Sequence, residues 1–519
     1  MRKWNSFMEI LKFPLMILVI AIFLRGISGT ILSPNVAKVV VFQQDFIYII
    51  AELISYFSGV IISNFPLIVL LKYLSRNHES ATPVVIGFLA YLLFNIVTMF
   101  LSDPNLPVTA YASILGLQVN AKSLHIAGET VRYPLQTGVV GALAVGVVSR
   151  FHYKRSRTRT VYGFLSFIDR DTWAYIATLI STILGAVAVS FLWPHLINGL
   201  YVVFNFIAYD IANPVNSFIY GIMDRLLSLV NLSSLIRAPF WFGEMGGSWI
   251  NSAGTTFFGD VAIWTAQAEA GIFGTGAGRF ITPYYIINMF ALPATLITIY
   301  RTYTDKLERR RYLLFIFVMI LFSILSGTIL PIELYLLFLA PMYFVFHLVI
   351  TGILFAVCQA IPIFIGYSYS GSVITANPGG IFDLTIYLRN LTIQNYAIIL
   401  VIIGIVVFAL YSLFGWFYYN RAALDILGTG SKIKKVNLFL ESIGGIKNVR
   451  SVNAGADKII VQVYDSLMLD FSKIQTSGAY KIVESRAGYS IYYGPSSTII
   501  KNEVAKRLKE REKLKLPRK

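Results

Sequence analysis

The chain has 519 residues, of which 56% are hydrophobic and only 13% are charged. This balance excludes an ordinary soluble domain and is typical of a multi-pass α-helical membrane protein. The formal net charge of +17 does not indicate a nucleic-acid partner, because the basic residues are not interleaved with aromatic residues on one soluble module.

Long apolar runs follow one another from the N-terminus onward. A membrane-spanning helix needs about 20 apolar residues. The sequence predicts about ten such helices, near residues 13–33, 46–73, 83–102, 137–150, 173–192, 196–232, 283–302, 312–330, 333–365 and 396–418. The first run begins like a signal peptide, but it continues without a small-residue cleavage site, so we interpret it as the first membrane helix.

Two short basic loops are predicted between these helices, at residues 151–160 and 301–311. Cytoplasmic loops of membrane proteins carry an excess of Lys and Arg. We therefore expect both loops, together with the basic end of the chain, on the cytoplasmic side of the cell membrane.

Residues 233–282 are rich in glycine, aromatic and polar residues, although apolar segments flank them. Backbone of such irregular composition does not face lipid. We expect this segment to pack within the protein or to line a cavity, where aromatic faces can stack on a ligand. A surface loop with scattered aromatic residues is the alternative.

Residues 326–352 are almost wholly apolar, yet they contain Glu333 and His347, and Pro331 and Pro341 interrupt them. A carboxylate at the bilayer centre costs about 3 kcal/mol or more, so it persists where it faces other protein or a water-filled path. Broken helices with a polar residue near the midplane are typical of transporters. A glutamate that caps a helix at the membrane surface is the alternative.

The composition becomes polar and mixed near residue 420. Residues 432–443 have the spacing of an amphipathic helix, and residues 458–465 and 489–494 alternate like strands. A charged helix at 503–513 closes the chain. This order predicts a small α/β domain, with an antiparallel sheet and helices on one face.

Glycine and serine at 428–431 punctuate the chain like a linker. We therefore predict three parts: a membrane domain over residues 1–420, a linker over 421–430 and a cytoplasmic α/β domain over 431–519.

Several kinds of chemistry have no support in the sequence. The single cysteine, Cys358, excludes an internal disulfide and any cysteine-based metal site, and the five scattered histidines show no metal-ligand spacing. The chain has no glycine-rich phosphate loop, so ATP-driven transport is not indicated. We predict no metal site and no cofactor.

Several motifs nevertheless run in a characteristic order: RAPFWF at 237–242, NSAG and GD within 251–260, NMFALPATLITIY at 288–300, residues 326–352 and IGYSYSGSVI at 365–374. Together they resemble the membrane IIC domain of glucose and N-acetylglucosamine permeases of the bacterial phosphotransferase system. The tail from residue 431 resembles the IIB domain of that system, through ESIGGIKNV and the later YYGPSS.

This resemblance implies a sugar as the ligand, the lipid membrane as the setting, a homodimer, and separate phosphocarrier proteins as partners. In that family the IIB domain carries a phosphocysteine. The IIC domain holds the sugar near the midplane and moves it across, and a phosphoryl group is then placed on the sugar.

The chain departs from the family pattern at its nucleophiles. Gly455 occupies the phosphocysteine position and offers no nucleophile, and Cys358, in a membrane segment, is no substitute. Ser233 and Ser234 stand where the family commonly has two histidines. His347 matches a different family histidine, which we expect to pack in the core or to bond a carbonyl.

The carboxylates are changed in part. The first glutamate of the family's Glu motif, its general base and sugar ligand, is Leu330 here, whereas the second is kept as Glu333. Asp224 and Arg225 match a Glu-Arg pair of the family. Glu244 is one alternative replacement for the missing carboxylate. The phosphoryl donor and the base are both absent at their family positions, so we assign no catalytic residue.

The leading hypothesis is therefore a sugar permease, for a hexose or amino-hexose, that works without phosphorylation by its own IIB-like tail. The solute would sit between the segment 224–239 and the turn 327–333. The candidate sugar-binding residues are Asp224, Arg225, Ser233, Ser234, Arg237 and Glu333. Polar contacts that merely join helices are the alternative role for each of them, and an ion pair is an alternative for Asp224 and Arg225.

Two other functions stay open on the sequence. The first is a working sugar phosphotransferase, an enzyme that receives phosphate from a separate IIB protein. The second is a membrane sugar sensor, in which the IIB-like tail reports on movements of the membrane domain.

Overall fold

We describe the protein from a computed structural model of the full chain. Its described residues are 2–32, 45–75, 80–101, 106, 111, 114–120, 131–158, 169–230, 232–303, 306–367, 378–419, 432–455, 457–485, 488–494 and 496–515. The predicted linker at 421–430 lies outside the described residues.

The chain forms two compact units. Unit 1 comprises residues 1–6, 284–350 and 397–519, and unit 2 comprises residues 7–283 and 351–396. The predicted division into a membrane domain over 1–420 and a tail domain over 431–519 stays a prediction.

Six helices among the described residues are long and apolar enough to cross a membrane: α3 (Asp45–Ser63), α5 (Thr82–Leu101), α7 (Arg170–Tyr209), α11 to α12 (Thr282–Thr302), α15 (Pro341–Ala360) and α17 (Leu391–Phe417). Shorter apolar helical stretches cover Phe13–Gly29, Phe65–Leu74 and Tyr312–Ser326. The chain is therefore a multi-pass membrane protein, and the predicted number of about ten helices stays a prediction.

The spanning helices expose large apolar side chains. Leu184 and Phe191 on α7 are 66% and 67% exposed, and Ile405 on α17 is 60% exposed. Apolar surface in water costs about 25 cal/mol per Å². Contact with lipid removes this cost, so these side chains mark helix faces that suit the bilayer.

α7 joins two segments that are predicted as separate helices. It runs for 40 residues through Pro194, which lies inside it. At 1.5 Å per residue such a helix is about 60 Å long, roughly twice the thickness of the hydrocarbon core. The chain breaks only at 210–213, and α8 (Pro214–Leu229) then begins, with Asn213 accepting a hydrogen bond from the Val215 amide.

The predicted basic loops are partly helical. Residues 151–157 form the last turns of α6 (Gly138–Arg157), and α13 (Lys306–Ser326) begins within the second basic stretch. Basic side chains at a helix C-terminus are favoured by the helix dipole. Arg157 also donates to the Tyr153 hydroxyl at 2.6 Å and pairs with Asp171 of α7 at 2.9 Å.

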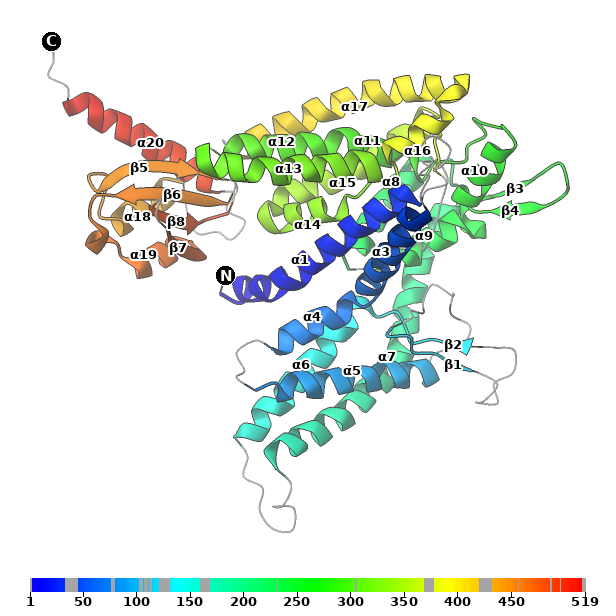
Figure 1. Cartoon of the computed structure of the whole chain (residues 1–519), viewed down its shortest axis with the longest axis horizontal. Coiled ribbons are helices and arrows are strands. Elements are labelled where there is room, and N and C mark those ends of the chain that lie inside the picture. The colour runs from blue at the N-terminus through cyan, green and yellow to red at the C-terminus, as the bar shows by residue number, and fades with distance from the viewer. Residues whose placement is uncertain are drawn as a thin grey trace. The chain divides into compact units, whose positions relative to one another are not determined.

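In unit 2, α4 (Phe65–Leu74), α5, α6 and α7 pack against one another (Figure 1). Their shared core includes Leu70, Leu74, Tyr91 and Phe94. A Cβ on Gly87 of α5 would lie 1.9 Å from the Leu74 Cδ1 atom, so the close packing of α4 on α5 requires glycine there. Other elements of unit 2 are α1 (Arg2–Ile31, from residue 7), α3, β1 (Val119–Asn120), β2 (Val131–Arg132), α8, α9 (Ser234–Trp241), η4 (Glu244–Gly246), β3 (Ser248–Ile250), β4 (Thr256–Phe258), α10 (Asp260–Glu269), α16 (Ile381–Thr385) and η7 (Ile386–Arg389).

Residues 233–282 combine both predicted arrangements. Phe240 and Trp241 of α9 are fully buried, as expected for a segment packed within the protein. The β3–β4 hairpin is instead a surface feature, with Ile250 63% exposed.

In unit 1, the π-helical turn η5 (Ile287–Ala291) leads into α12 (Leu292–Thr302), and α13 packs against α12. The two prolines of the apolar stretch begin helices: Pro331 lies in the first turn of α14 (Leu330–Leu339), and Pro341 is the first residue of α15. Proline is tolerated there because the first turn of a helix needs no intrahelical N–H donor. The rings of Phe346 on α15 and Phe414 on α17 stack with centroids 3.8 Å apart, which joins these two helices within unit 1.

The tail holds a four-stranded antiparallel sheet in the order β5-β6-β8-β7 (Figure 1). Strands β6 and β8 match the two predicted strands, whereas β5, β7 and the short α19 were not predicted. Phe439, Ile459, Ile491 and Val504 belong to one core that joins the sheet to helices α18 and α20. The elements are α18 (Lys432–Ser442), β5 (Val449–Ala454), β6 (Lys458–Val463), η9 (Ser466–Met468), α19 (Phe471–Thr476), β7 (Lys481–Ser485), β8 (Gly488–Tyr492) and α20 (Ser496–Lys515).

Candidate functional site

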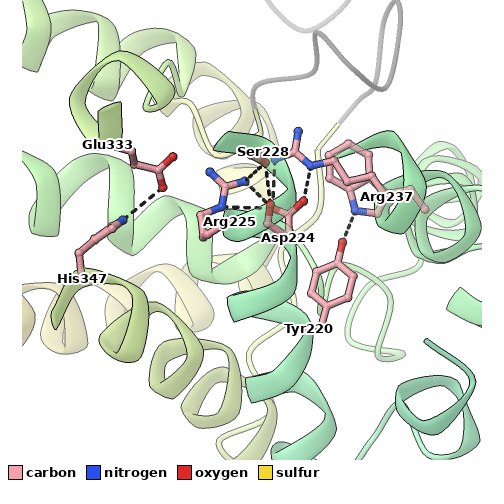
Figure 2. Close-up of polar contacts among 8 residues, drawn as sticks. Tyr220, Asp224, Arg225, Ser228, Arg237, Glu333 and His347 are labelled. Atoms are coloured by element: carbon pink, nitrogen blue, oxygen red, sulfur yellow. Dashed lines mark hydrogen bonds and ion pairs between the residues drawn. The ribbon is translucent and has the colours of Figure 1, made fainter. Parts of the chain in front are cut away.

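A buried ionic cluster in unit 2 brings together three of the predicted site residues. Asp224 and Arg225 lie on α8, and Arg237 lies on α9; none of the three is more than 5% exposed. The Arg237 Nε atom donates to Asp224 Oδ1 at 2.7 Å, and its Nη2 atom donates to Oδ2 at 3.1 Å. Arg225 also donates to Oδ2, from Nε at 3.2 Å and from Nη2. Figure 2 shows the Asp224 carboxylate between the two guanidinium groups.

The geometry of this cluster is that of a strong buried ion pair. Bidentate Arg–carboxylate bonds are about twice as strong as bonds between neutral groups. Within the cluster one carboxylate faces two guanidinium groups, so Asp224 is held rigidly in the ionised form. The Ser228 hydroxyl, one turn further along α8, donates to the Asp224 carbonyl oxygen at 2.7 Å.

Aromatic side chains support the Arg237 end of the cluster. The Arg237 guanidinium lies 5.0 Å from the centroid of the Trp241 ring, one turn along α9. The Trp241 indole N–H donates to the Tyr220 hydroxyl on α8 at 2.9 Å. The Trp241–Tyr220 hydrogen bond and the Arg237–Asp224 ion pair join the two helices, and the cation–π contact within α9 supports the Arg237 side chain.

A glycine turn fixes the far end of α9. Gly259 has a φ of +88°, and a Cβ there would lie 2.3 Å from the Phe242 amide nitrogen. Only glycine allows both the left-handed backbone and this close approach. The start of α10 is therefore held against the end of the helix that carries Arg237.

The two serines lie beside this cluster in sequence. Ser233 and Ser234 are 5% and 7% exposed and mark the start of α9. The Ser234 hydroxyl donates to the Gln136 side-chain oxygen at 3.0 Å. Ser234 therefore joins α9 to the segment before α6, which is the helix-joining role that was left open for it.

Glu333 belongs to a second buried cluster, in unit 1. It lies in the first turn of α14, and the His347 Nε2 atom of α15 is 3.2 Å from its Oε1 atom (Figure 2). The His347 Nδ1 atom is 2.9 Å from the Tyr411 hydroxyl of α17. All three side chains are fully buried, so Glu333 is not a cap at an exposed helix end.

The surroundings of His347 differ from the expectation. We expected this histidine to pack or to bond a carbonyl, but both of its ring nitrogens face titratable side chains. The reason is tertiary: α14 precedes α15 directly in the sequence, whereas α17, which carries Tyr411, comes from a later part of the chain. Leu330, at the family position of the missing glutamate, is the first residue of α14 and half-buried.

Gly455, at the family position of the phosphocysteine, lies in the turn between β5 and β6. Its amide donates to the Lys458 carbonyl oxygen at 2.8 Å. A Cβ at this position would lie 2.6 Å from the Tyr303 Cε1 atom, at the end of α12. The Lys458 amino group lies 6.0 Å from the Tyr312 ring of α13, and the Tyr303 and Tyr312 rings stack with centroids 4.6 Å apart. In unit 1 the tail is thus docked on an aromatic surface formed by the ends of α12 and α13.

The structure places four of the predicted residues in buried clusters, each within one unit. Asp224, Arg225 and Arg237 form one in unit 2, and Glu333 belongs to one in unit 1. Sequence reasoning missed Tyr411 and Tyr303, because an aromatic residue in or beside an apolar helix carries no local signal of its partner.

The comparison with known families now adds to this geometry. A sequence model of the family described as "Phosphotransferase system, EIIC" matches residues 8–352. The chain belongs to this family. The matched range of the EIIC family contains both ion-pair clusters except for Tyr411, and it ends before α17 and the tail.

One curated relative of this EIIC protein is the "PTS system glucoside-specific EIICBA component" of Staphylococcus carnosus (strain TM300). The two sequences are 29% identical over 381 residues, which cover 71% of this chain and 53% of the relative. The chain thus spans about half the length of this curated relative.

Proposed function

We propose that this EIIC protein is a sugar permease of the cell membrane that moves a hexose or amino-hexose without phosphorylation by its own tail. Membership of the EIIC family over residues 8–352 supports sugar transport. The name of the Staphylococcus carnosus relative, "glucoside-specific", supports a glucoside or a related sugar as the ligand.

One observation carries the non-phosphorylating part of the proposal: the contact between Gly455 and Tyr303. Gly455 has no nucleophilic side chain, and the space that a thiol would fill is occupied by the Tyr303 ring at 2.6 Å from an added Cβ. A phosphoryl donor needs a nucleophile that is exposed to its acceptor. At position 455 the docked tail offers neither the nucleophile nor the exposure, which supports a structural or regulatory role for the tail.

For sugar binding we propose Asp224, Arg225 and Arg237, with Ser233, Ser234 and Glu333. Arg237 and Arg225 hold the Asp224 carboxylate in one orientation, and preorganised polar groups bind a sugar at lower entropic cost. Ser233 adds a hydroxyl at the start of α9. The Ser234 bond to Gln136 makes Ser234 the weakest member of this set.

A cytoplasmic tail is part of the proposal. Tyr303 lies within the second basic stretch and Tyr312 directly follows it, and the tail contacts both through Gly455 and Lys458. The tail and that stretch therefore share one side of the membrane, which the excess of Lys and Arg assigns to the cytoplasm. A homodimer and separate phosphocarrier proteins, both implied by the family resemblance, complete the proposed set of partners.

The deciding experiment measures the chemical form of the sugar after uptake. The purified full chain is reconstituted into liposomes, and radiolabelled methyl glucoside and N-acetylglucosamine are supplied as probes, with and without the general phosphotransferase proteins and a separate IIB protein. We expect entry of free sugar in every case, separated from sugar phosphate by ion exchange. Protein-dependent formation of sugar phosphate would contradict the proposal and favour a phosphotransferase.

A further inference from the structure

The buried cluster of unit 1 suggests how such a permease is energised. We infer that Glu333, His347 and Tyr411 form a proton-binding site that couples sugar entry to a proton gradient. This inference rests on the proposed function, because it names the driving force of the same permease.

The first step of the argument is that the three side chains form a continuous chain of titratable groups. Glu333 Oε1 lies 3.2 Å from His347 Nε2, and His347 Nδ1 lies 2.9 Å from the Tyr411 hydroxyl. All three are fully buried, and they come from α14, α15 and α17. Ionisable groups placed in this way within membrane helices are the usual components of proton relays.

The second step is that the chain of groups has two protonation states with the same heavy-atom contacts. A neutral imidazole donates from one nitrogen and accepts at the other, so it can donate to Glu333 and accept from the Tyr411 hydroxyl. A protonated imidazole donates from both nitrogens, to the Glu333 carboxylate and to the Tyr411 oxygen. One proton is therefore bound or released without breaking a contact.

Titratable side chains of unit 1 contact this site from more than one helix. Glu333 faces it from α14, and Tyr343 of α15 donates its hydroxyl to the Tyr411 carbonyl oxygen at 2.8 Å. The stacked rings of Phe346 and Phe414 lie beside them on α15 and α17 and keep the surroundings apolar.

The third step concerns energy. Gly455 removes the phosphoryl donor of the tail, so uphill sugar entry requires another source. In the proposed cycle one proton from the outer aqueous phase binds the Glu333–His347 pair. The same proton leaves to the cytoplasm after the sugar, so only N–H and O–H bonds form and break.

The transport test uses the reconstituted full chain with radiolabelled methyl glucoside. Counterflow exchange at equal pH measures transport alone, and accumulation with the interior one pH unit more alkaline measures coupling. One proton per sugar gives about tenfold accumulation, because one pH unit corresponds to a tenfold ratio. We expect His347→Gln and Tyr411→Phe to lower the accumulation ratio toward one. Cys358→Ser, a buried change on the same helix, should leave it at the wild-type value.

A second readout does not depend on the sugar. The ring ¹⁵N signals of His347, assigned by their loss in His347→Gln, should report a change of protonation between pH 5 and 9 that Glu333→Gln shifts. Signals that stay constant over this range would overturn the proton site. Counterflow without pH-driven accumulation would contradict proton coupling but would still agree with a sugar permease. A change of His347 protonation without counterflow of any sugar probe would support the proton-binding site and contradict the proposed function.

Discussion

At the residue scale, several charged side chains that are buried in the described part of the chain are held in specific pairs. Asp224 accepts hydrogen bonds from both Arg225 and Arg237, and Glu333 meets His347. A buried charge without a partner costs several kcal/mol, so each of these contacts is a condition of folding before it is a condition of function. Substitutions at the two clusters therefore need a stability measurement beside any transport assay.

Asp224→Asn should destabilise unit 2 by about 3–5 kcal/mol, the usual cost of breaking a buried ion pair by removing one partner. The neutral amide keeps the shape but offers one acceptor to two guanidinium groups. The measurement is the unfolding temperature of the purified protein in detergent. Val230→Ala, an exposed change at the end of the same helix, is the control and should stay within about 0.5 kcal/mol. An unchanged unfolding temperature in Asp224→Asn would show that the cluster does not stabilise the fold.

Gly455→Ala should weaken the docking of the tail, because the new Cβ would lie 2.6 Å from the Tyr303 ring. Overpacking of this kind costs about 1–3 kcal/mol. We expect faster hydrogen exchange in β5 and β6. Tyr303→Ala removes the clash, so the double variant should lose less stability than the sum of the two single changes. Additive effects would mean that Gly455 and Tyr303 do not meet.

At the element scale, the effect of proline depends on its place in the helix. Pro331 and Pro341 lie in the first turn of α14 and at the first residue of α15, where no N–H is needed. Pro194 lies within α7, which continues through it.

Asp260, the first residue of α10, connects this helix to a later loop. Its carboxylate accepts hydrogen bonds from the Gly278 and Phe280 amides at 2.8 and 3.1 Å.

Asp260 should make stability depend on pH. Burial raises the pKa of its carboxyl from 3.8 to about 6, against the opposing effects of Arg279 and of the backbone hydrogen bonds. A pKa raised by folding favours the protonated form, so the stabilising contribution is complete below pH 4 and declines as the pH rises toward 6 and above. Relative to Asp260→Asn, the wild type should lose about 2 kcal/mol between pH 4 and pH 7. If the free energies of unfolding of the wild type and of Asp260→Asn change in parallel with pH across this range, the expected pKa of Asp260 is wrong.

At the scale of the whole molecule, the chain passes repeatedly between apolar helices and polar segments. Within unit 1, the tail follows α17 in the sequence and contacts the ends of α12 and α13. This contact ties the sidedness of the tail to that of the basic stretch at 301–311. The charge distribution then predicts the orientation of the chain in the membrane.

The predicted orientation can be tested with single cysteines in a Cys358→Ser background, which has no other cysteine. Thr158→Cys, after α6, and Lys473→Cys, on α19, are both exposed positions. A membrane-impermeant maleimide should label neither position in intact cells and both in inside-out vesicles. Detergent-permeabilised cells are the control for reactivity, and labelling of Lys473→Cys in intact cells would place the tail outside.

The sequence by itself determined the class of protein, several element boundaries and the family. Apolar runs of about 20 residues indicate membrane helices in any context, because the bilayer requires that length and composition. Alternation was sufficient to predict β6 and β8. The strands β5 and β7 were missed because VRSVNA and KIVES mix polar and apolar residues without regular alternation.

Only the tertiary structure decided which side chains meet. Arg237 is 13 residues from Asp224, and Tyr411 is 64 residues from His347, so no local pattern connects them. The same is true of Gly455 and Tyr303, whose contact depends on how the tail docks on α12. A sequence motif shows which chemical groups the chain contains. Hydrogen bonds and ion pairs act over about 3 Å, so they form only where the folded backbone brings distant segments together.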